Sequence, residues 1–272
     1  MEDFGSQIII NIRKGIKIHT FVAPFKAFAD ATHIIETQNQ LVLIDSQFTI
    51  PNALEFRKYA DSLGKPIKYI FISHSHPDHY FGLSSAFEGV PSFTYQPIQD
   101  SIKKTASFFQ KEEKSKMGDL IPSKINYPAN IIRPGKVIMD DLLYEFGLIK
   151  NAEDKNQMVI QFPKINVRIV QDLISNGSHL YLTTDMGHWI FVLENMYLTI
   201  GPTTLLLCGH GPPGYRPLIG FNLNYLKIAK KIYNTKGMTR EEFKKQIINA
   251  YPELEGRGLI DLYLPQLFPD SN

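Results

Sequence analysis

The chain has 272 residues, of which 43% are hydrophobic and 21% charged, and its formal net charge is +2 at pH 7. This composition is typical of a globular protein and excludes a disordered chain. The small net charge, with no basic run long enough to follow a phosphate backbone, argues against a nucleic-acid-binding protein. No apolar run reaches membrane-spanning length and no secretory signal pattern opens the chain, so a cytoplasmic protein with no membrane partner is expected.

Short runs rich in β-branched residues predict strands in the first part of the chain, over 8–12, 16–22, 33–36 and 41–44. Apolar residues at helical spacing then predict a helix over 53–63, which stops at Gly64-Lys65-Pro66. A further strand is expected over 67–72. Two helices follow it, one over 82–87 and one with a mixed-charge face within 99–116.

The second half repeats the strand pattern, over 136–139, 144–149, 158–162, 167–170 and 203–208. Helices are expected from near Trp189, over 218–233, after the capping-box residue Thr239, and within 256–268. Strands interleaved with helices predict an α/β or α+β protein with helices outside, and residues 1–272 are expected to form a single domain.

The strongest functional signal is the run His74-Ser75-His76-Pro77-Asp78-His79, which follows the strand expected over 67–72. Imidazole and carboxylate are the ligands that hold zinc, iron or manganese. His74 and His76 lie two residues apart and would face the same way if the strand continued. Asp78 and His79 come after a bend, from which they can reach a second metal. The alternative is a polar surface loop that happens to be rich in histidine.

Three further candidate ligands follow later strands, at the ends where α/β folds gather their active sites. Glu153 follows the strand over 144–149, Asp172 the strand over 167–170, and His210 the strand over 203–208. Each also has an ordinary interpretation, as a solvated carboxylate, a helix cap or turn residue, or a loop histidine. Their order after the first motif is what favours a shared site.

The chain resembles the metallo-β-lactamase-fold hydrolase superfamily over about residues 16 to 235, in motifs and in their order. The residues that carry the resemblance are His74, His76, Asp78 and His79, then Gln171-Asp172-Leu173, Gly209-His210-Gly211-Pro212 and Val42-Leu43-Ile44-Asp45. The resemblance implies an αββα four-layer sandwich, in which two mixed β-sheets lie between outer helices and the metals lie at one edge.

The resemblance also implies two metal sites. His74 and His76 would hold the first metal, Asp78, His79 and His210 the second, and Asp172 would bridge them. Members usually supply a third histidine to the first metal, yet this chain has no histidine between His79 and His179. Glu153 is the candidate for that place, and Asp154 is the second candidate. The expected cofactors are two divalent ions, zinc first, with manganese or iron favoured by the extra carboxylate.

Two divalent ions that share a water can turn it into a hydroxide nucleophile near neutral pH. The expected function is therefore a metal-dependent hydrolase of a small ester, lactone, amide or thioester. Asp78 would orient the nucleophile, Asp172 would shuttle a proton, and His179 would reach the substrate or a ligand. The alternatives are an alkylsulfatase-like sulfuric-ester hydrolase and a degenerate, non-catalytic metal-binding member of the fold. The only partner expected is a small-molecule substrate, and the sequence does not give the oligomeric state.

Other candidates have structural interpretations. His19 and His33 fall in expected strands, and His188 lies at an expected helix start. Cys208 fits a small buried residue, not a nucleophile, and as the only cysteine it forms no internal disulfide, which fits a reducing compartment. Two long excursions, residues 97–128 and the C-terminal tail, are candidate covers for the site.

Overall fold

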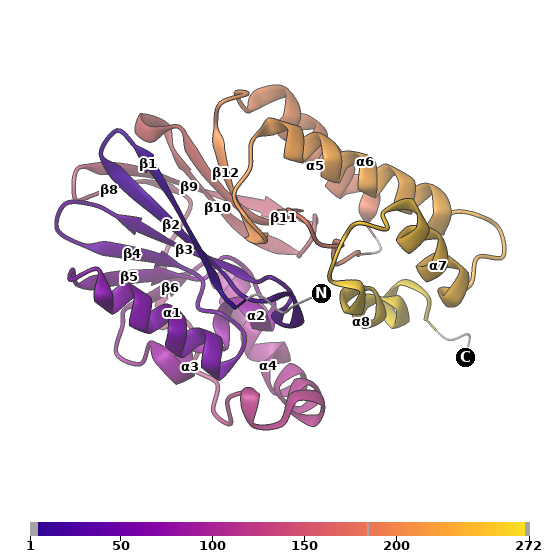
Figure 1. Ribbon diagram of the computed structural model, residues 1–272, viewed down its shortest axis with the longest axis horizontal. Helices are drawn as coiled ribbons and strands as arrows, with labels where there is room; N and C mark the ends of the chain where they lie inside the picture. The colour runs from indigo at the N-terminus through magenta and orange to yellow at the C-terminus, as the bar shows by residue number, and fades with distance from the viewer. Residues whose placement is uncertain (1–4, 184, 270–272) are drawn as a thin grey trace.

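Two mixed β-sheets pack face to face and carry helices on both outer sides (Figure 1). The computed structural model describes residues 5–183 and 185–269. The layers are those of an αββα sandwich, so the predicted fold class is confirmed. Within the described residues, none of the helices has the length and apolar character needed to cross a bilayer.

The first sheet has seven strands in the spatial order β1 to β7. The strands β1 to β4 pair antiparallel, and β4 to β7 pair parallel. Their bounds are β1 (Gln7–Arg13), β2 (Ile16–Val22), β3 (Ala31–Glu36), β4 (Leu41–Ile44), β5 (Ile67–Phe71), β6 (Ser92–Thr94) and β7 (Asn130–Ile131). Because parallel strands β4 and β5 end at the same edge, the loops after them meet there.

The second sheet has five strands in the order β12-β11-β10-β9-β8. Only the β11–β12 pair is parallel, and the other neighbours are antiparallel. The bounds are β8 (Gly135–Met139), β9 (Leu142–Lys150), β10 (Asn156–Phe162), β11 (Val167–Ser175) and β12 (Leu205–His210). The parallel pair brings the ends of β11 and β12 together at one edge.

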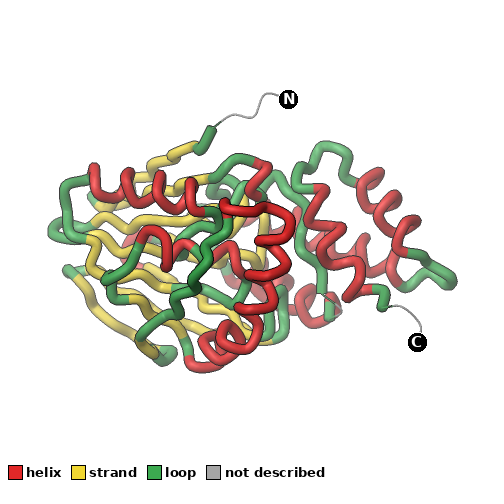
Figure 2. Tube along the Cα trace, turned by 90° about the horizontal axis from the view of Figure 1, so that it is seen from below, coloured by secondary structure: helices red, strands yellow, loops and turns green. Residues whose placement is uncertain are grey.

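The helices form the outer layers (Figures 1 and 2). The helices α1 (Ile50–Ser62) and α3 (Gly82–Ala86) lie along the first sheet, and α5 (Met186–Thr199) and α6 (Arg216–Tyr233) lie along the second. The remaining helices are α2 (Pro77–Tyr80), α4 (Gln96–Met117), α7 (Arg240–Ala250) and α8 (Arg257–Leu267). Thr49 and Thr239 cap α1 and α7, each accepting a hydrogen bond from a backbone N–H of the first turn.

Two apolar cores hold these layers together. The first lies between the sheets and continues under α1, α3 and α4. Between the sheets, the rings of Phe71 on β5 and Phe146 on β9 approach to 4.9 Å between centroids. The second lies between the second sheet and its helices. Its largest member is Trp189 on α5, which is fully buried and donates its indole N–H to the carbonyl oxygen of Leu173 on β11, at 3.1 Å. The cores fix the sheet edges relative to each other, which matters for the site.

The structure differs from the sequence-based prediction at short elements and strand ends. The strands β6 and β7 and the helix α2 were not predicted, because two to four residues are too few for a periodic signal. The strand β11 continues to Ser175 instead of ending at 170, and β12 continues to His210. Asp172 and His210 therefore lie within paired strands, not in the loops after them. A register irregularity interrupts the β11–β12 pairing at Gln171, whose φ is +42°.

Candidate metal centre

The turn after β5 supplies four of the candidate ligands. The strand ends at Phe71, and Pro77 starts α2, where a proline suits the first helical turn because no N–H is needed there. His74 and His76 lie in the turn between them, and Asp78 and His79 lie in the one turn of α2. His74 and His79 are fully buried, and their ring centroids lie 4.1 Å apart.

The first cluster consists of His74, His76, Glu153 and Asp172, whose potential ligand atoms lie within 4.8 Å of one another. Glu153, in the tight turn between β9 and β10, places Oε1 at 3.1 Å from Nδ1 of His76 and Oε2 at 3.6 Å from Nε2 of His74. Asp172 Oδ2 lies 3.6 Å from Nε2 of His74. Four donor atoms converge on one small volume.

The second cluster consists of Asp78, His79, Asp172 and His210, again with ligand atoms within 4.8 Å of one another. His79 Nε2 lies 3.3 Å from Asp172 Oδ1, and His210 Nε2 lies 3.0 Å from Asp172 Oδ2. Asp78 Oδ2 lies 3.5 Å from both of these histidine nitrogens. Asp172 belongs to both clusters, so its two oxygens face two neighbouring volumes.

The donor atoms of these clusters fit divalent cations. Glu153 Oε1 and Oε2, Asp172 Oδ1 and His79 Nε2 are all buried, and no hydrogen-bond donor or acceptor satisfies them. A buried polar atom without a partner costs free energy, and a bound cation removes that cost. Mixed imidazole and carboxylate ligands suit zinc, manganese or iron. His/Asp/Glu clusters of this kind support divalent metal binding.

Asp45, directly after β4, fixes the orientation of two candidate ligands. Its Oδ2 accepts hydrogen bonds from the Ser73 hydroxyl at 2.7 Å and from His79 Nδ1 at 2.9 Å. Its Oδ1 accepts from the backbone N–H of Ser73 at 2.8 Å. Because the Ser73 hydroxyl donates to Asp45, it must accept from His74 Nδ1, 2.9 Å away. Both histidines therefore hold Nδ1 as a donor and turn Nε2, the nitrogen available to a metal, toward the clusters.

A second chain of hydrogen bonds continues from Asp45 to the other sheet. Gln171 on β11 donates its amide N–H to Asp45 Oδ2 and accepts from His33 Nε2 at 3.0 Å. His33 Nε2 also faces the carbonyl oxygen of Cys208 at 3.1 Å, which can only accept, so this nitrogen carries the proton. Its Nδ1 accepts from the Thr20 hydroxyl at 2.9 Å.

His210 is oriented in the same way by a carbonyl. Its Nδ1 donates to the carbonyl oxygen of Phe28 at 2.9 Å, so Nε2 is the nitrogen that faces Asp172, 3.0 Å from Oδ2. Backbone conformation near the site is also unusual: Asp45 and Gln171 both have positive φ, at +63° and +42°. Such strain in residues other than glycine is typical of functional sites.

The carboxyl and imidazole groups of the site shift one another's pKa values. Burial alone would lower the pKa of His76 and His210, but the facing carboxylates of Glu153 and Asp172 raise them to about 10 and about 9, while burial raises the pKa of Glu153 to about 7. Burial alone would raise the pKa of Asp172, but the facing imidazoles of His79 and His210 outweigh it and hold this pKa well below its usual range. Burial and the neighbouring imidazole of His79 lower the pKa of His74 well below its usual value. An ionised Asp172 and a neutral His74 are the protonation states that bind a metal.

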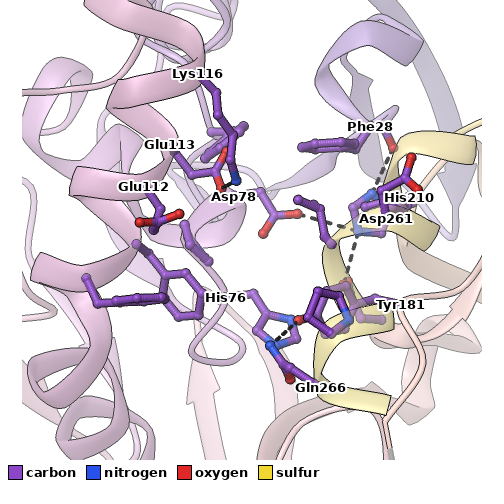
Figure 3. Close-up of a pocket in the computed structure, with 18 residues that line it drawn as sticks. Phe28, His76, Asp78, Glu112, Glu113, Lys116, Tyr181, His210, Asp261 and Gln266 are labelled. Carbon is purple, nitrogen blue, oxygen red and sulfur yellow. Dashed lines mark hydrogen bonds and ion pairs between the residues drawn. The ribbon is translucent and has the colours of Figure 1, made fainter. Parts of the chain in front are cut away.

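A cavity of about 400 Å³ opens on the two clusters (Figure 3). Four candidate ligands line it, His76, Asp78, Asp172 and His210. The helices α4 and α8 line it too, together with Phe28, Phe48, Pro77 and Tyr181, so both excursions named as candidate covers contribute to it. A volume of this size lies within the range that binds small organic molecules, about 300–1,000 Å³.

The structure separates the two candidates for the missing histidine. Glu153 is 1% exposed and joins the first cluster, whereas Asp154 points away from it. Asp154 Oδ2 instead accepts hydrogen bonds from the backbone N–H and hydroxyl of Ser75, at 3.1 and 2.7 Å. Asp154 thus ties the Glu153 turn to the His74–His76 turn.

His179, expected to reach the substrate or a ligand, lies elsewhere. It is 1% exposed, its Nδ1 makes a hydrogen bond of 2.9 Å with the hydroxyl of Tyr225 on α6, and burial lowers its pKa to about 4. It is in neither cluster and is not among the described residues that line the cavity. The short loop after β11 turns it into the second apolar core, a direction that sequence spacing does not give.

Tyr181 lines the cavity and carried no signal in the sequence. Its ring packs edge-on against His76, with centroids 5.1 Å apart, and its hydroxyl accepts a hydrogen bond from Gln266 on α8 at 3.0 Å. Burial raises the pKa of its hydroxyl to about 12, so the phenol keeps its proton at neutral pH. A lone tyrosine in a loop has no motif, and only the fold brings it to the site.

Comparison with known proteins identifies the fold. Residues 30–88, which include Asp45 and the His74–His79 motif, match the model of the metallo-beta-lactamase superfamily. The chain has the metallo-β-lactamase fold. The resemblance seen in the sequence is thereby confirmed. No curated protein matches the chain at a significant level.

Solved structures agree on the fold. A metallo-beta-lactamase from Pontibacter korlensis matches with a TM-score of 0.62 at 17% identity, covering 81% of this chain and 99% of that one. A metallo beta lactamase from Hirschia baltica matches with a TM-score of 0.60 at 16% identity, covering 82% and 98%. The lactamase FIM-1 from Pseudomonas aeruginosa, solved in a mono-zinc form, matches with a TM-score of 0.61 at 16% identity, covering 84% and 98%. At 16% to 17% identity, these matches show the fold alone.

Proposed function

We propose that this protein is a metal-dependent hydrolase of a small ester, lactone, amide or thioester. The observation that carries the proposal is Asp172, a carboxylate shared between two donor clusters at the base of a cavity. A purely structural metal site is closed by its ligands, whereas a catalytic site keeps access for a substrate. The fold and the donor clusters support metal-dependent hydrolysis in general, and the named reaction is our inference.

Two divalent ions are proposed, one for each cluster, with Asp172 between them. His74, His76 and Glu153 would hold the first ion, and Asp78, His79 and His210 the second. When bound, such ions activate water for attack and polarise the substrate oxygen. Zinc is the first choice because four of the ligands are imidazoles. Manganese and iron are the alternatives because Asp78, Glu153 and Asp172 add hard oxygen donors.

The residues of the chain have distinct parts in this proposal. Asp78 and Asp172 both line the cavity, where their carboxylates orient the attacking water and accept its proton. The protonated Tyr181 hydroxyl, next to His76, donates a hydrogen bond to the substrate oxygen. The helices α4 and α8 hold the rest of the substrate and exclude water from it.

The experiment that tests the proposal is metal content by elemental analysis, with hydrolysis of a panel of nitrophenyl esters, lactones and thioesters measured on the same samples. Glu153→Ala is expected to lose about one metal equivalent per chain and most of the activity, because three ligands then remain for the first ion. Asp172→Ala is expected to weaken both sites. The control is Glu145→Gln on β9, a surface carboxylate that pairs with Lys136 at 2.7 Å.

Several outcomes would count against the proposal. If Asp172→Ala kept full turnover, the shared carboxylate would have no part in the reaction. A tightly bound metal with no turnover of any ester, lactone, amide or thioester would favour the non-catalytic alternative. Metal content unchanged in Glu153→Ala would remove Glu153 from the ligand set.

A further inference from the structure

The mouth of the cavity is acidic. Glu112 and Glu113 on α4 and Asp261 on α8 line it, on opposite sides in Figure 3. Among the described lining residues, the single lysine or arginine is Lys116, and its Nζ is held by Glu113 Oε1 at 2.8 Å. Asp261 Oδ1 is paired with Lys244 Nζ at 2.6 Å, and Lys244 is not a lining residue of the cavity. Glu112 has no ion-pair partner in the described part of the chain. The described lining of the cavity therefore offers no unpaired lysine or arginine to an anionic substrate.

The base of the cavity adds to this effect. Asp78, Asp172 and Glu153 contribute three negative charges, which offset three of the four positive charges of two divalent ions. A histidine in place of Glu153 would leave only two carboxylates. Glu153 is thus expected to reduce the attraction of the metal centre for anions, because it places one more negative charge within 3.6 Å of the first-cluster ligands.

The walls of the cavity are apolar and aromatic. Phe108 and Phe109 on α4 contact each other with ring centroids 5.5 Å apart, and Phe28 and Phe48 form a second pair at 5.9 Å. Leu259 and Leu262 on α8 also line the cavity. Phe108 is 63% exposed, which is high for an aromatic residue beside a cavity. An exposed aromatic surface next to a buried one is a typical site for an apolar ligand.

We propose that this cavity selects uncharged substrates with an apolar or aromatic group, and rejects substrates that carry a carboxylate, sulfate or phosphate. The apolar group packs between the phenylalanines of α4 and the leucines of α8, and Glu112 repels anions at the mouth. The naming of an uncharged ester or lactone as the substrate rests on the proposed hydrolase function, whereas the charge selection by the cavity does not. Because sulfuric esters are anions, this charge selection argues against the alkylsulfatase-like alternative.

The first test measures binding without turnover. N-phenyl-1-naphthylamine and 8-anilino-1-naphthalenesulfonate share one aromatic skeleton and differ by a sulfonate, and both fluoresce when bound. The metal-loaded protein is expected to bind the neutral dye at least about tenfold more tightly. Glu112→Gln is expected to tighten sulfonate binding by roughly threefold and leave the neutral dye unchanged. Equal or tighter binding of the sulfonate by the wild type would overturn the proposal.

Two control variants test whether the change in dye binding arises in the cavity. Asp100→Asn changes the same charge on the same helix outside the cavity lining, and is expected to change neither dye. Phe108→Ala is expected to weaken both dyes, since it removes apolar contact and no charge. Sulfonate binding that responds to Asp100→Asn as much as to Glu112→Gln would contradict a local role of Glu112.

The second test separates this proposal from the proposed function. It compares the kcat/KM for 4-nitrophenyl pentanoate with that for the monoester of 4-nitrophenol with glutaric acid, which carries a terminal carboxylate. A preference of about tenfold or more for the neutral ester is expected. Hydrolysis of both esters with the carboxylate preferred would overturn the charge selection and leave the hydrolase function standing. If the protein binds the neutral dye selectively but hydrolyses neither ester, the charge selection stands and the hydrolase function is overturned.

Discussion

Single side chains decide how the donor atoms of this site face inward. Asp45 accepts hydrogen bonds from Ser73, His79 and Gln171, and all of these partners act as donors toward it. Burial alone would raise the pKa of Asp45, but the nearby imidazole of His79 outweighs it and lowers this pKa below its usual value. An ionised Asp45 can accept from every partner at once, which keeps His74 and His79 in the orientation that a metal requires.

Asp45→Asn tests this role at the residue scale. An amide has one acceptor oxygen and adds two N–H donors, so at least one of the donors facing position 45 loses its acceptor. Metal affinity is expected to fall by about 10- to 100-fold, which is typical of partners that orient metal ligands. Competition with a chelator measures the affinity, and circular dichroism checks the fold. Asp61→Asn, at an exposed pair with Arg57, is the control. An unchanged affinity would mean that Asp45 is not needed to orient the histidines.

At the scale of elements, the site depends on how closely the strands β11 and β12 approach. Gly209 on β12 lies against the side chain of Asp172 on β11, and a Cβ at this position would come within 1.7 Å of Asp172 Oδ1. Any larger residue must displace the shared carboxylate. A glycine is therefore required here by close approach, since its φ is not among the positive values.

Gly209→Ala is expected to move Asp172 and to lower the metal content of both clusters, while the protein still folds. The measurement is metal content together with the free energy of unfolding in denaturant. Gly258→Ala on α8, where a Cβ would meet no atom within 4 Å, is the control and should be neutral or slightly stabilising. Full metal occupancy in Gly209→Ala would show that Asp172 can shift without loss.

Across the whole molecule, His33 links the two sheets. It lies on β3 of the first sheet and contacts Gln171 on β11 and Cys208 on β12 of the second. Burial lowers its pKa to about 4, because the interior penalises the charged imidazolium. The unfolded chain binds a proton at this histidine below about pH 6.5, whereas the folded chain does so only near pH 4. The stability that the folded chain gains from keeping His33 neutral is therefore complete above pH 6.5, and it is lost as the pH falls toward 4.

The expected result is a loss of about 2 to 3 kcal/mol of unfolding free energy from His33 between pH 7.5 and 4.5. Denaturant unfolding of the wild type and of His33→Gln at both pH values measures it, and the variant should lose less stability than the wild type by this amount. Thr20→Val removes a hydrogen bond to His33 but keeps the titrating group, so it should keep the full pH dependence. Identical pH dependence in the wild type and His33→Gln would refute the assignment.

Much of this protein was predictable from local sequence. β-Branched runs and helical spacing gave β2 and β4 with the observed bounds, and placed α1, α6 and α7 within a few residues. The motif from His74 to His79 predicted that its side chains lie close together, because they are only two to five residues apart in one turn. The later candidate ligands Asp172 and His210 were predicted from their places after expected strands and from the resemblance in order, while their positions inside strands were not predicted.

The amino-acid sequence determined most of the elements, and the resemblance that it carries implied the αββα class and six of the seven candidate donor residues. Only the tertiary structure placed Glu153, and not Asp154, in the first cluster, turned His179 toward Tyr225, and brought Tyr181, α4 and α8 to the cavity. The reason is physical. A strand or a capped helix depends on interactions between residues near in sequence, whereas the direction of a loop side chain depends on which distant elements pack against it.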